Sequence, residues 1–191
     1  MQHQKIFATN IFLLDNFIDN PDTMKEYIGD LWKERDYDVN WQTKSANLHT
    51  KKEFKSFSDL IIKTGKDICN TLGYDVKDLV ITDMWANQMK DGGYGMHPPH
   101  THSNNFLSGV YYLYGSDETA PIQFFDPRPQ ASVLQPRFNK PNRYNSSMLQ
   151  FNSVEGTGYI FPSWLMHWVP TNVHERISIS WNIIVRGPYG Q

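Results

Sequence analysis

The amino-acid sequence predicts an antiparallel β-sandwich or barrel that is backed by helices. After Gly73, at least six short segments rich in β-branched and aromatic residues follow one another, and turn residues separate them. Before Gly73, two segments carry apolar residues at helical spacing. Two helices followed by many short strands indicate one sheet layer or barrel with helices packed on it.

Two helices are expected in the N-terminal part, after a short strand in "IFLLDNF". Asn20 suits the N-cap of the first helix, and Pro21 suits its first position, where a missing N–H costs little. The apolar face of this helix comprises Met24, Tyr27, Ile28 and Leu31. The second helix is expected to start at Ser56 or Ser58 and to end at Gly73. One side of it is lined by Leu60, Ile61, Ile68 and Leu72, with the single cysteine, Cys69, as a buried thiol.

The predicted strands lie in "DLVITDMWANQM", "NFLSGVYYLY", "PIQFFD", "SMLQFN", "TGYIFP" and "ERISISWNIIV". Alternation of apolar and polar residues is cleanest in the last segment, where the set Ile177, Ile179 and Trp181 opposes Ser178, Ser180 and Asn182. The pair Ser108 and Gly109 indicates close packing between strands. The polar, proline-punctuated loop from Gln135 to Ser147 is expected to be exposed and to serve as a lid.

Composition limits the classes of function. The formal net charge is −2, so the basic footprint of a nucleic-acid-binding protein is missing. The N-terminal segment has no basic region leading into a long apolar run, and no segment approaches the ~20 apolar residues that a membrane helix requires. A single cysteine cannot form an internal disulfide. We therefore expect a cytoplasmic protein whose ligand is a small molecule, and the sequence does not indicate its oligomeric state.

Three of the seven histidines fall in the stretch "HPPHTH", immediately before a strongly apolar segment. His100 and His102 are two positions apart, so on a strand both imidazoles point to one face. Imidazole is the commonest ligand for transition metals, and His167 in "FPSWLMHWVP" is the best candidate for a third ligand. Two prolines separate His97 from His100, which favours a loop position or a supporting role for His97. The alternative is that the H-x-H pair is an accidental surface feature.

Several blocks in a fixed order resemble the 2-oxoglutarate/iron(II) oxygenases. These blocks are H-x-H leading into "FLSGVYYL", then "IQFFDPR", then "FPSWLMHWVPTN", then "ERISISWNI", and they cover residues 85–185. The most similar group contains uncharacterised bacterial and phage proteins. The resemblance implies a double-stranded β-helix, also called a jelly roll and related to the cupins. It also implies one oxygenase-like domain over residues 1–191, in which 1–78 form a mainly helical support layer and 79–186 form the β-helix core.

The resemblance implies roles for particular residues. His100 matches the first metal-binding histidine of the family and His167 matches the distal one. Arg176, nine positions after His167, matches the residue that binds the far carboxylate of 2-oxoglutarate. Ser178 completes an R-x-S pattern that adds a second bond to that carboxylate, and Tyr112 matches a tyrosine that reaches it. Fe(II) is thus the implied metal, and 2-oxoglutarate the implied cosubstrate.

One position departs from the family pattern, because His102 stands where the metal-binding carboxylate is expected. Two alternatives follow. Either three neutral histidines hold the metal, or His102 supports the site and a distant carboxylate, with Asp126 as the candidate, completes it. The substrate pocket is expected to include Asn87, Arg128 and Trp168.

The leading hypothesis is therefore an Fe(II)/2-oxoglutarate-dependent dioxygenase that hydroxylates an unidentified substrate and releases succinate and CO2. The main alternative is a non-oxidative, cupin-like protein in which three histidines hold a metal for small-molecule binding or isomerisation. Arg176 and Ser178 discriminate between the two, because a cupin of that kind has no use for a cosubstrate anchor at this spacing. A third alternative is a structural protein that has kept the jelly roll and lost its metal.

Overall fold

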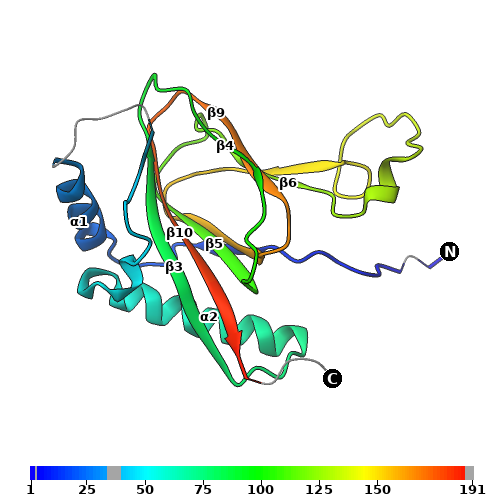
Figure 1. Cartoon of the computed structure of the whole chain (residues 1–191). Helices are drawn as coiled ribbons and strands as arrows, with labels where there is room; N and C mark the ends of the chain where they lie inside the picture. Colours follow the sequence, from blue (N-terminus) through cyan, green and yellow to red (C-terminus); the bar gives the residue numbers. More distant parts are fainter. Residues whose placement is uncertain (3, 34–39, 188–191) are drawn as a thin grey trace.

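The computed structural model describes residues 1–2, 4–33 and 40–187, and within these residues ten strands form two facing antiparallel sheets (Figure 1). The larger sheet has the order β1-β8-β5-β10-β3-β2, with strands Phe12–Asp15, Thr157–Pro162, Leu107–Tyr114, Arg176–Arg186, Asp78–Met89 and Asn40–Gln42. The smaller sheet has the order β4-β9-β6-β7, with strands Gly95–His100, His167–Asn172, Ile122–Phe125 and Met148–Phe151. All six predicted β-segments are strands, so the predicted β-sandwich backed by helices is confirmed.

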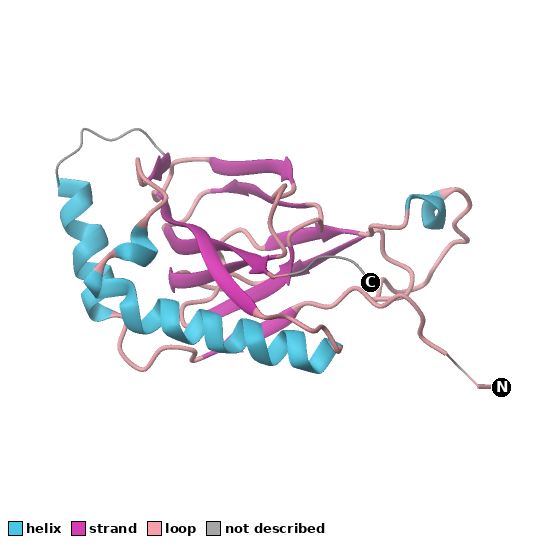
Figure 2. Cartoon of the chain, turned by 60° about the horizontal axis from the view of Figure 1, so that its bottom comes forward, coloured by secondary structure: helices cyan, strands magenta, loops and turns pink. Residues whose placement is uncertain are grey.

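Helices α1 (Asp22–Lys33) and α2 (Lys55–Leu72) cover the outer face of the larger sheet (Figure 2). The predicted cap of α1 is confirmed, because the Asp22 N–H donates to Asn20 Oδ1 at 2.9 Å. The predicted start of α2 is wrong. The helix begins at Lys55, directly after the 3-10 turn Lys52–Phe54, and no side chain caps it.

The C-terminal end of α2 lies where the sequence predicts it. Gly73 has a φ of 75°, and the Tyr74 N–H donates to the Cys69 carbonyl, which together form a Schellman motif. The predicted packing face is only partly right, because Leu72 is exposed and Leu60 is half-buried. The buried face comprises Phe57, Ile61, Gly65, Ile68 and Cys69.

The main core lies between the helices and the larger sheet. Trp181 is fully buried there, with its ring 5.4 Å from the Phe57 ring in an edge-to-face arrangement. Gly109 lies opposite Trp181 on the neighbouring strand, and a Cβ at Gly109 would lie 2.3 Å from the indole. The expectation of close strand packing at Ser108 and Gly109 is confirmed.

Strands β4 and β9 were not among the strands predicted from the sequence, although both carry histidines of the proposed metal site. Each contains proline, which cannot donate to a ladder and is confined to edges or bulges. β4 is an edge strand with an irregularity between His97 and His100, where Pro98 and Pro99 lie. The β9 register shifts between Val169 and Asn172, the stretch that includes the proline of β9.

The first 78 residues do more than support the sheet. β1 pairs with β8 and β2 pairs with β3, so this segment supplies both edge strands of the larger sheet. No helix in the described part of the chain is long and apolar enough to cross a membrane. A second core of Val110, Tyr112, Ile122, Phe124, Tyr159, Phe161 and Leu165 fills part of the space between the two sheets. The functional cavity lies beside this second core.

Candidate metal centre and cosubstrate pocket

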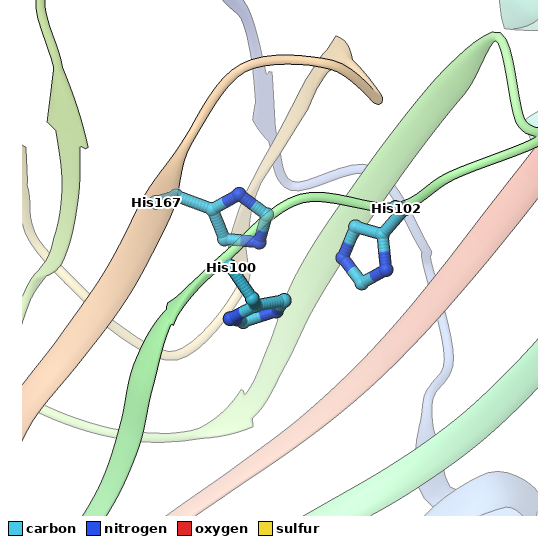
Figure 3. A group of neighbouring side chains, drawn as sticks. All are labelled: His100, His102 and His167. Atoms are coloured by element: carbon cyan, nitrogen blue, oxygen red, sulfur yellow. The ribbon is translucent and has the colours of Figure 1, made fainter.

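Three histidines from two distant parts of the chain converge between the sheets (Figure 3). His100 ends β4, His167 begins β9, and the two residues are paired in register. His102 follows just beyond the end of β4. One ring nitrogen of each of the three lies within 4.8 Å of the others. The ring of His167 is 4.4 Å from that of His100 and 5.1 Å from that of His102. This spacing suits three imidazoles that share one metal ion.

Two of these imidazoles are oriented by backbone carbonyls. His100 Nδ1 lies 2.7 Å from the Pro98 carbonyl oxygen, and His167 Nδ1 lies 2.9 Å from that of Leu165. A carbonyl can only accept, so each Nδ1 carries the proton and each Nε2 keeps a free lone pair. This orientation by a hydrogen bond on the second nitrogen is usual for histidines that bind metals.

Two of the three histidines, His102 and His167, are kept neutral by their surroundings. Burial lowers the pKa of His167 to about 3. Burial, with a smaller contribution from the neighbouring His100, lowers the pKa of His102 to about 4. A metal needs unprotonated imidazole, so these two residues present the required form at neutral pH.

The histidines line a cavity of about 160 Å³ between the two sheets. The lining comprises Gln42, Trp85, Asn87, His97, His100, His102, Gly109, Val110, Ile122, Phe161, His167, Val169, Arg176, Ser178 and Ser180. No acidic side chain is among these lining residues. The cavity therefore brings together a cluster of nitrogen ligands and one permanent positive charge.

That charge belongs to Arg176, which is only 2% exposed. Its Nη1 lies 3.4 Å from Ser178 Oγ, and its Nε has no hydrogen-bond partner among the described residues. The guanidinium carbon lies 4.8 Å from the centroid of the Tyr112 ring. The Tyr112 hydroxyl is also buried without a partner in the described chain, and burial raises its pKa while the nearby Arg176 opposes the rise. A buried guanidinium without a counter-ion is costly, so this pocket requires an anion.

Asn87 of β3 lies in a polar row that crosses four strands. In register it is opposite Ser178 on one side and Gln42 on the other, and Ser178 is in turn opposite Tyr112. Asn87 is 5% exposed, lines the cavity, and its Oδ1 has no partner among the described residues. The structure thus places Asn87 in the cavity wall, and its role in binding the substrate stays a prediction.

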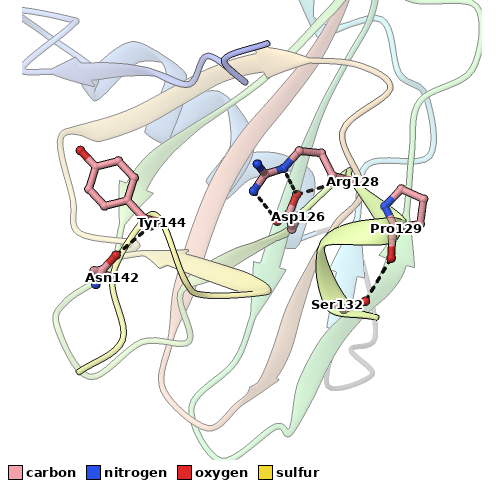
Figure 4. Close-up of polar contacts among 6 residues, drawn as sticks. All are labelled: Asp126, Arg128, Pro129, Ser132, Asn142 and Tyr144. Atoms are coloured by element: carbon pink, nitrogen blue, oxygen red, sulfur yellow. Dashed lines mark hydrogen bonds and ion pairs between the residues drawn. The ribbon is translucent and has the colours of Figure 1, made fainter. Parts of the chain in front are cut away.

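Four of the expected site residues lie outside the cavity lining. One is Tyr112, which packs against the Arg176 guanidinium, and the others are Asp126, Arg128 and Trp168. Asp126 accepts two hydrogen bonds from the Arg128 side chain, at 2.9 and 2.8 Å, and one from the Arg128 N–H (Figure 4). These bonds lower the pKa of the Asp126 carboxyl group and fix both residues in a turn. Trp168 of β9 donates its indole N–H to the sulfur of Met148 on β7, across the intervening strand β6. Neither Asp126, Arg128 nor Trp168 joins the histidine cluster or the cavity wall.

The loop from Gln135 to Ser147 is exposed along almost its whole length, as the sequence predicts. It connects β6 and β7 and projects away from the sheets (Figure 1), and it contains an Asn142–Tyr144 contact (Figure 4). None of its residues lines the cavity. Its role as a lid stays a prediction.

One cavity residue for which the sequence predicts only a loop position or a supporting role is His97. It lines the cavity together with His100 and Arg176. Burial first, then the positive charge of Arg176 and the neighbouring His100, lower its pKa to about 4. The sequence favours a loop position for His97 because of the Pro98–Pro99 pair, but in the structure this pair forms the irregular part of strand β4.

The two facing sheets and the enclosed histidine cluster define a jelly-roll protein with an internal metal-binding cavity. The sequence profile of the 2OG-Fe(II) oxygenases matches residues 83–182, just over half of the chain, and the chain belongs to this family. A search of curated protein sequences found no match.

Solved structures agree on the fold. A prolyl-4-hydroxylase from Pseudomonas putida is 12% identical with a TM-score of 0.62, covering 94% of this chain and 95% of its own. The α-ketoglutarate-dependent epimerase SnoN from nogalamycin biosynthesis is 12% identical with a TM-score of 0.65, and the match covers 92% of this chain and 76% of SnoN. HygX from Streptomyces hygroscopicus, solved with nickel, 2-oxoglutarate and hygromycin B bound, is 10% identical with a TM-score of 0.61. The match covers 92% of this chain and 82% of HygX. The predicted double-stranded β-helix is confirmed.

Family membership makes the chain an Fe(II)- and 2-oxoglutarate-dependent oxygenase, and it does not favour the cupin-like alternative. The residues that line the cavity fit both the metal ion, Fe(II), and the cosubstrate, 2-oxoglutarate. Three imidazoles bring their ligand atoms together at one point, and an arginine with no acidic partner among the described residues faces the same cavity.

Proposed function

We propose that His100, His102 and His167 hold Fe(II), and that Arg176 and Ser178 bind the far carboxylate of 2-oxoglutarate. The enzyme then hydroxylates a substrate that is still to be identified and releases succinate and CO2. The observation that carries this proposal is Arg176, a buried guanidinium without an acidic partner in the described chain, in the same cavity as three imidazoles. Bound Fe(II) and 2-oxoglutarate supply the oxidising chemistry with dioxygen, and the chain supplies binding and geometry.

The metal ligands are held rigidly. His100 and His167 face each other across paired strands, and a backbone carbonyl fixes each ring. His102 is held at its backbone, where its N–H donates to the Ser163 carbonyl at 2.9 Å. Ligands that are fixed before the metal arrives need little reorganisation when it binds.

The cosubstrate residues form a carboxylate pocket. Arg176 and Ser178 are two apart on β10 and both line the cavity, as strand alternation requires. A guanidinium binds a carboxylate through charge-assisted hydrogen bonds, each worth about 1.5–3 kcal/mol. The unpartnered Tyr112 hydroxyl adds a donor beneath the guanidinium. An incoming carboxylate satisfies groups that the empty pocket leaves without partners.

The third metal ligand is proposed to be His102 and not Asp126. The Asp126 carboxylate is engaged by Arg128 and lies outside the cavity lining, whereas the His102 ring lies 5.0 Å from the His100 ring. A ligand set of three neutral nitrogens then holds the metal without a protein anion. The substrate side of the pocket is assigned to Asn87. A cytoplasmic location and a phage or bacterial origin stay predictions from the sequence.

The test is an anaerobic titration of the metal-free protein with Fe(II) and then 2-oxoglutarate, following the visible charge-transfer band of the chelate. Arg176→Met should weaken 2-oxoglutarate binding about 100-fold or more, because it removes the one permanent cation among the described lining residues, and it should leave metal uptake unchanged. Arg128→Ala is the matched control, since Arg128 is exposed and outside the cavity. This variant should bind Fe(II) and 2-oxoglutarate with the affinities of the wild type. Normal 2-oxoglutarate binding by the Arg176→Met protein would show that the cosubstrate assignment is wrong.

A further inference from the structure

His97 and His100 both line the cavity, although they are three residues apart on the same strand. In a regular strand, side chains at odd spacing point to opposite faces. The pairing of β4 with β9 explains the exception. His97 is opposite Val169 and His100 is opposite His167, so three steps along β4 match only two along β9. This is a β-bulge, and it contains Pro98 and Pro99.

The bulge changes which residues face the cavity. One extra residue shifts the alternation by one, so that a second imidazole of β4 is turned inward. The prolines fit this place because β4 is an edge strand, where a missing N–H donor is tolerated. The same prolines provide the carbonyl that fixes the ring of His100, through Pro98. The bulge therefore sets the positions of both histidines.

His97 has polar neighbours in the cavity but no protein partner of its own. No hydrogen bond or ion pair joins its ring to another residue of the described chain. After burial, the positive charge of Arg176 lowers the pKa of His97 most, and His100 lowers it less. His97 lines the same cavity of about 160 Å³ as Arg176 and Ser178 at its anion-binding end and as the three converging histidines. It is not one of the three histidines whose ligand atoms converge.

A neutral imidazole carries one N–H that can donate. Beside a cation that awaits an anion, the natural acceptor for this N–H is the same anion. We propose that His97 is a cosubstrate-binding residue that donates a hydrogen bond to the far carboxylate of 2-oxoglutarate, alongside Arg176 and Ser178. This inference rests on the proposed function, because it takes 2-oxoglutarate as the anion that Arg176 binds.

The proposal is tested with two His97 variants. His97→Leu removes the N–H while keeping an apolar side chain of moderate size, and His97→Gln keeps an N–H donor. His174→Gln is the control, because His174 lies outside the cavity lining. For each protein, the dissociation constants of 2-oxoglutarate and of pyruvate are measured anaerobically with Fe(II), by the chelate band, and with Ni(II), by calorimetry. Metal affinity and thermal unfolding are measured in parallel. Pyruvate is used because it is a 2-oxo acid that lacks the far carboxylate.

We expect His97→Leu to raise the dissociation constant of 2-oxoglutarate about 10- to 100-fold, the effect of losing one hydrogen bond to a charged group. His97→Gln should bind within about threefold of the wild type, and His174→Gln should match it. Pyruvate and metal affinities should not change in any variant. This pattern separates a contact with the far carboxylate from a general effect on folding, since a misfolded site would lose all three ligands.

Three results would overturn the inference. These are unchanged 2-oxoglutarate binding by His97→Leu, an equal loss for pyruvate, and a parallel loss of metal affinity that makes His97 a fourth ligand. Each of these leaves the proposed function intact, provided that the wild-type protein forms the chelate. A wild-type protein that takes up Fe(II) but gives no chelate with 2-oxoglutarate contradicts the proposed function itself, and the His97 inference falls with it.

Discussion

The guanidinium group of Arg176 lies 4.8 Å from the centre of the Tyr112 ring, and both side chains are sealed from solvent. They come from neighbouring strands, and their closeness follows from the register. Ser178 is opposite Tyr112, and Arg176 is two residues before Ser178 on the same face of β10. The ring supports the cation by a cation–π contact, while the hydroxyl and the guanidinium Nε are left without partners among the described residues.

Tyr112→Phe should therefore lower the affinity for 2-oxoglutarate without lowering the free energy of unfolding. The change removes only a buried hydroxyl that has no partner, so the free energy of unfolding of the metal-free protein should stay the same or rise by up to about 1 kcal/mol. The 2-oxoglutarate affinity should fall about 3- to 10-fold, because one donor to the carboxylate is lost. Chemical denaturation and anaerobic titration measure the two quantities. A variant that is less stable but binds 2-oxoglutarate normally would contradict the role of this hydroxyl.

The identity of the third metal ligand can be decided with two substitutions. His102→Ala should lower Fe(II) affinity by at least about 10-fold, because it removes one of three nitrogen ligands. Asp126→Asn should leave Fe(II) affinity unchanged, because Arg128 already occupies that carboxylate. Competition with a metal-sensitive chelator measures both. The opposite pattern would restore Asp126 as the ligand and make His102 a supporting residue.

Gly109 should tolerate no side chain. A Cβ there would lie 2.3 Å from the Trp181 indole, which cannot move because it packs against Phe57. Gly109→Ala should therefore lower the free energy of unfolding by about 1–3 kcal/mol or more. Gly29→Ala is the matched control, since Gly29 lies within α1 with no atom near its missing Cβ, and it should raise stability by about 0.5–1 kcal/mol. Urea denaturation compares the two, and a Gly109→Ala protein as stable as the wild type would contradict the packing described.

The metal-free protein should lose stability on acidification below about pH 6.5. In the unfolded chain, imidazoles take up protons near pH 6.5, whereas in the folded protein burial lowers the pKa of His102 to about 4 and that of His167 to about 3. The unfolded state thus binds more protons in this interval, so stability is complete above pH 6.5 and falls as the pH drops toward 4. Thermal unfolding between pH 8 and 4 measures this effect.

A His167→Gln variant should show a shallower dependence on pH, because one of the buried imidazoles has been removed. An equally steep dependence in this variant would mean that other groups cause the acid sensitivity. Added Zn(II) should raise the unfolding temperature throughout the range from pH 8 to about 5, because His102 and His167 stay unprotonated in the folded protein over that range.

Much of the fold follows from local patterns in the sequence. Gly73 ends α2 because a glycine accepts the positive φ of a helix terminus at little cost, and the alternation from Ile177 to Asn182 defines a strand with one apolar face. The start of α2 was not predictable in this way. A 3-10 turn with the buried Phe54 leads into the helix, so tertiary packing replaces the side-chain cap that the serines suggested.

The candidate site also has features that local sequence patterns predict and features that depend on tertiary structure. The kind of chemistry could be predicted from residue types and spacing, because the H-x-H pair, the distal histidine and the R-x-S pattern resemble the family motifs. Which side chains share a cavity could not be predicted in this way and depends on the packing of the two sheets. Asn87 and His97 lie in the cavity wall, whereas Tyr112, Asp126, Arg128 and Trp168 do not. The reason is that the direction of a side chain depends on strand register, and a bulge such as that at Pro98 and Pro99 is set by pairing with a strand almost seventy residues away.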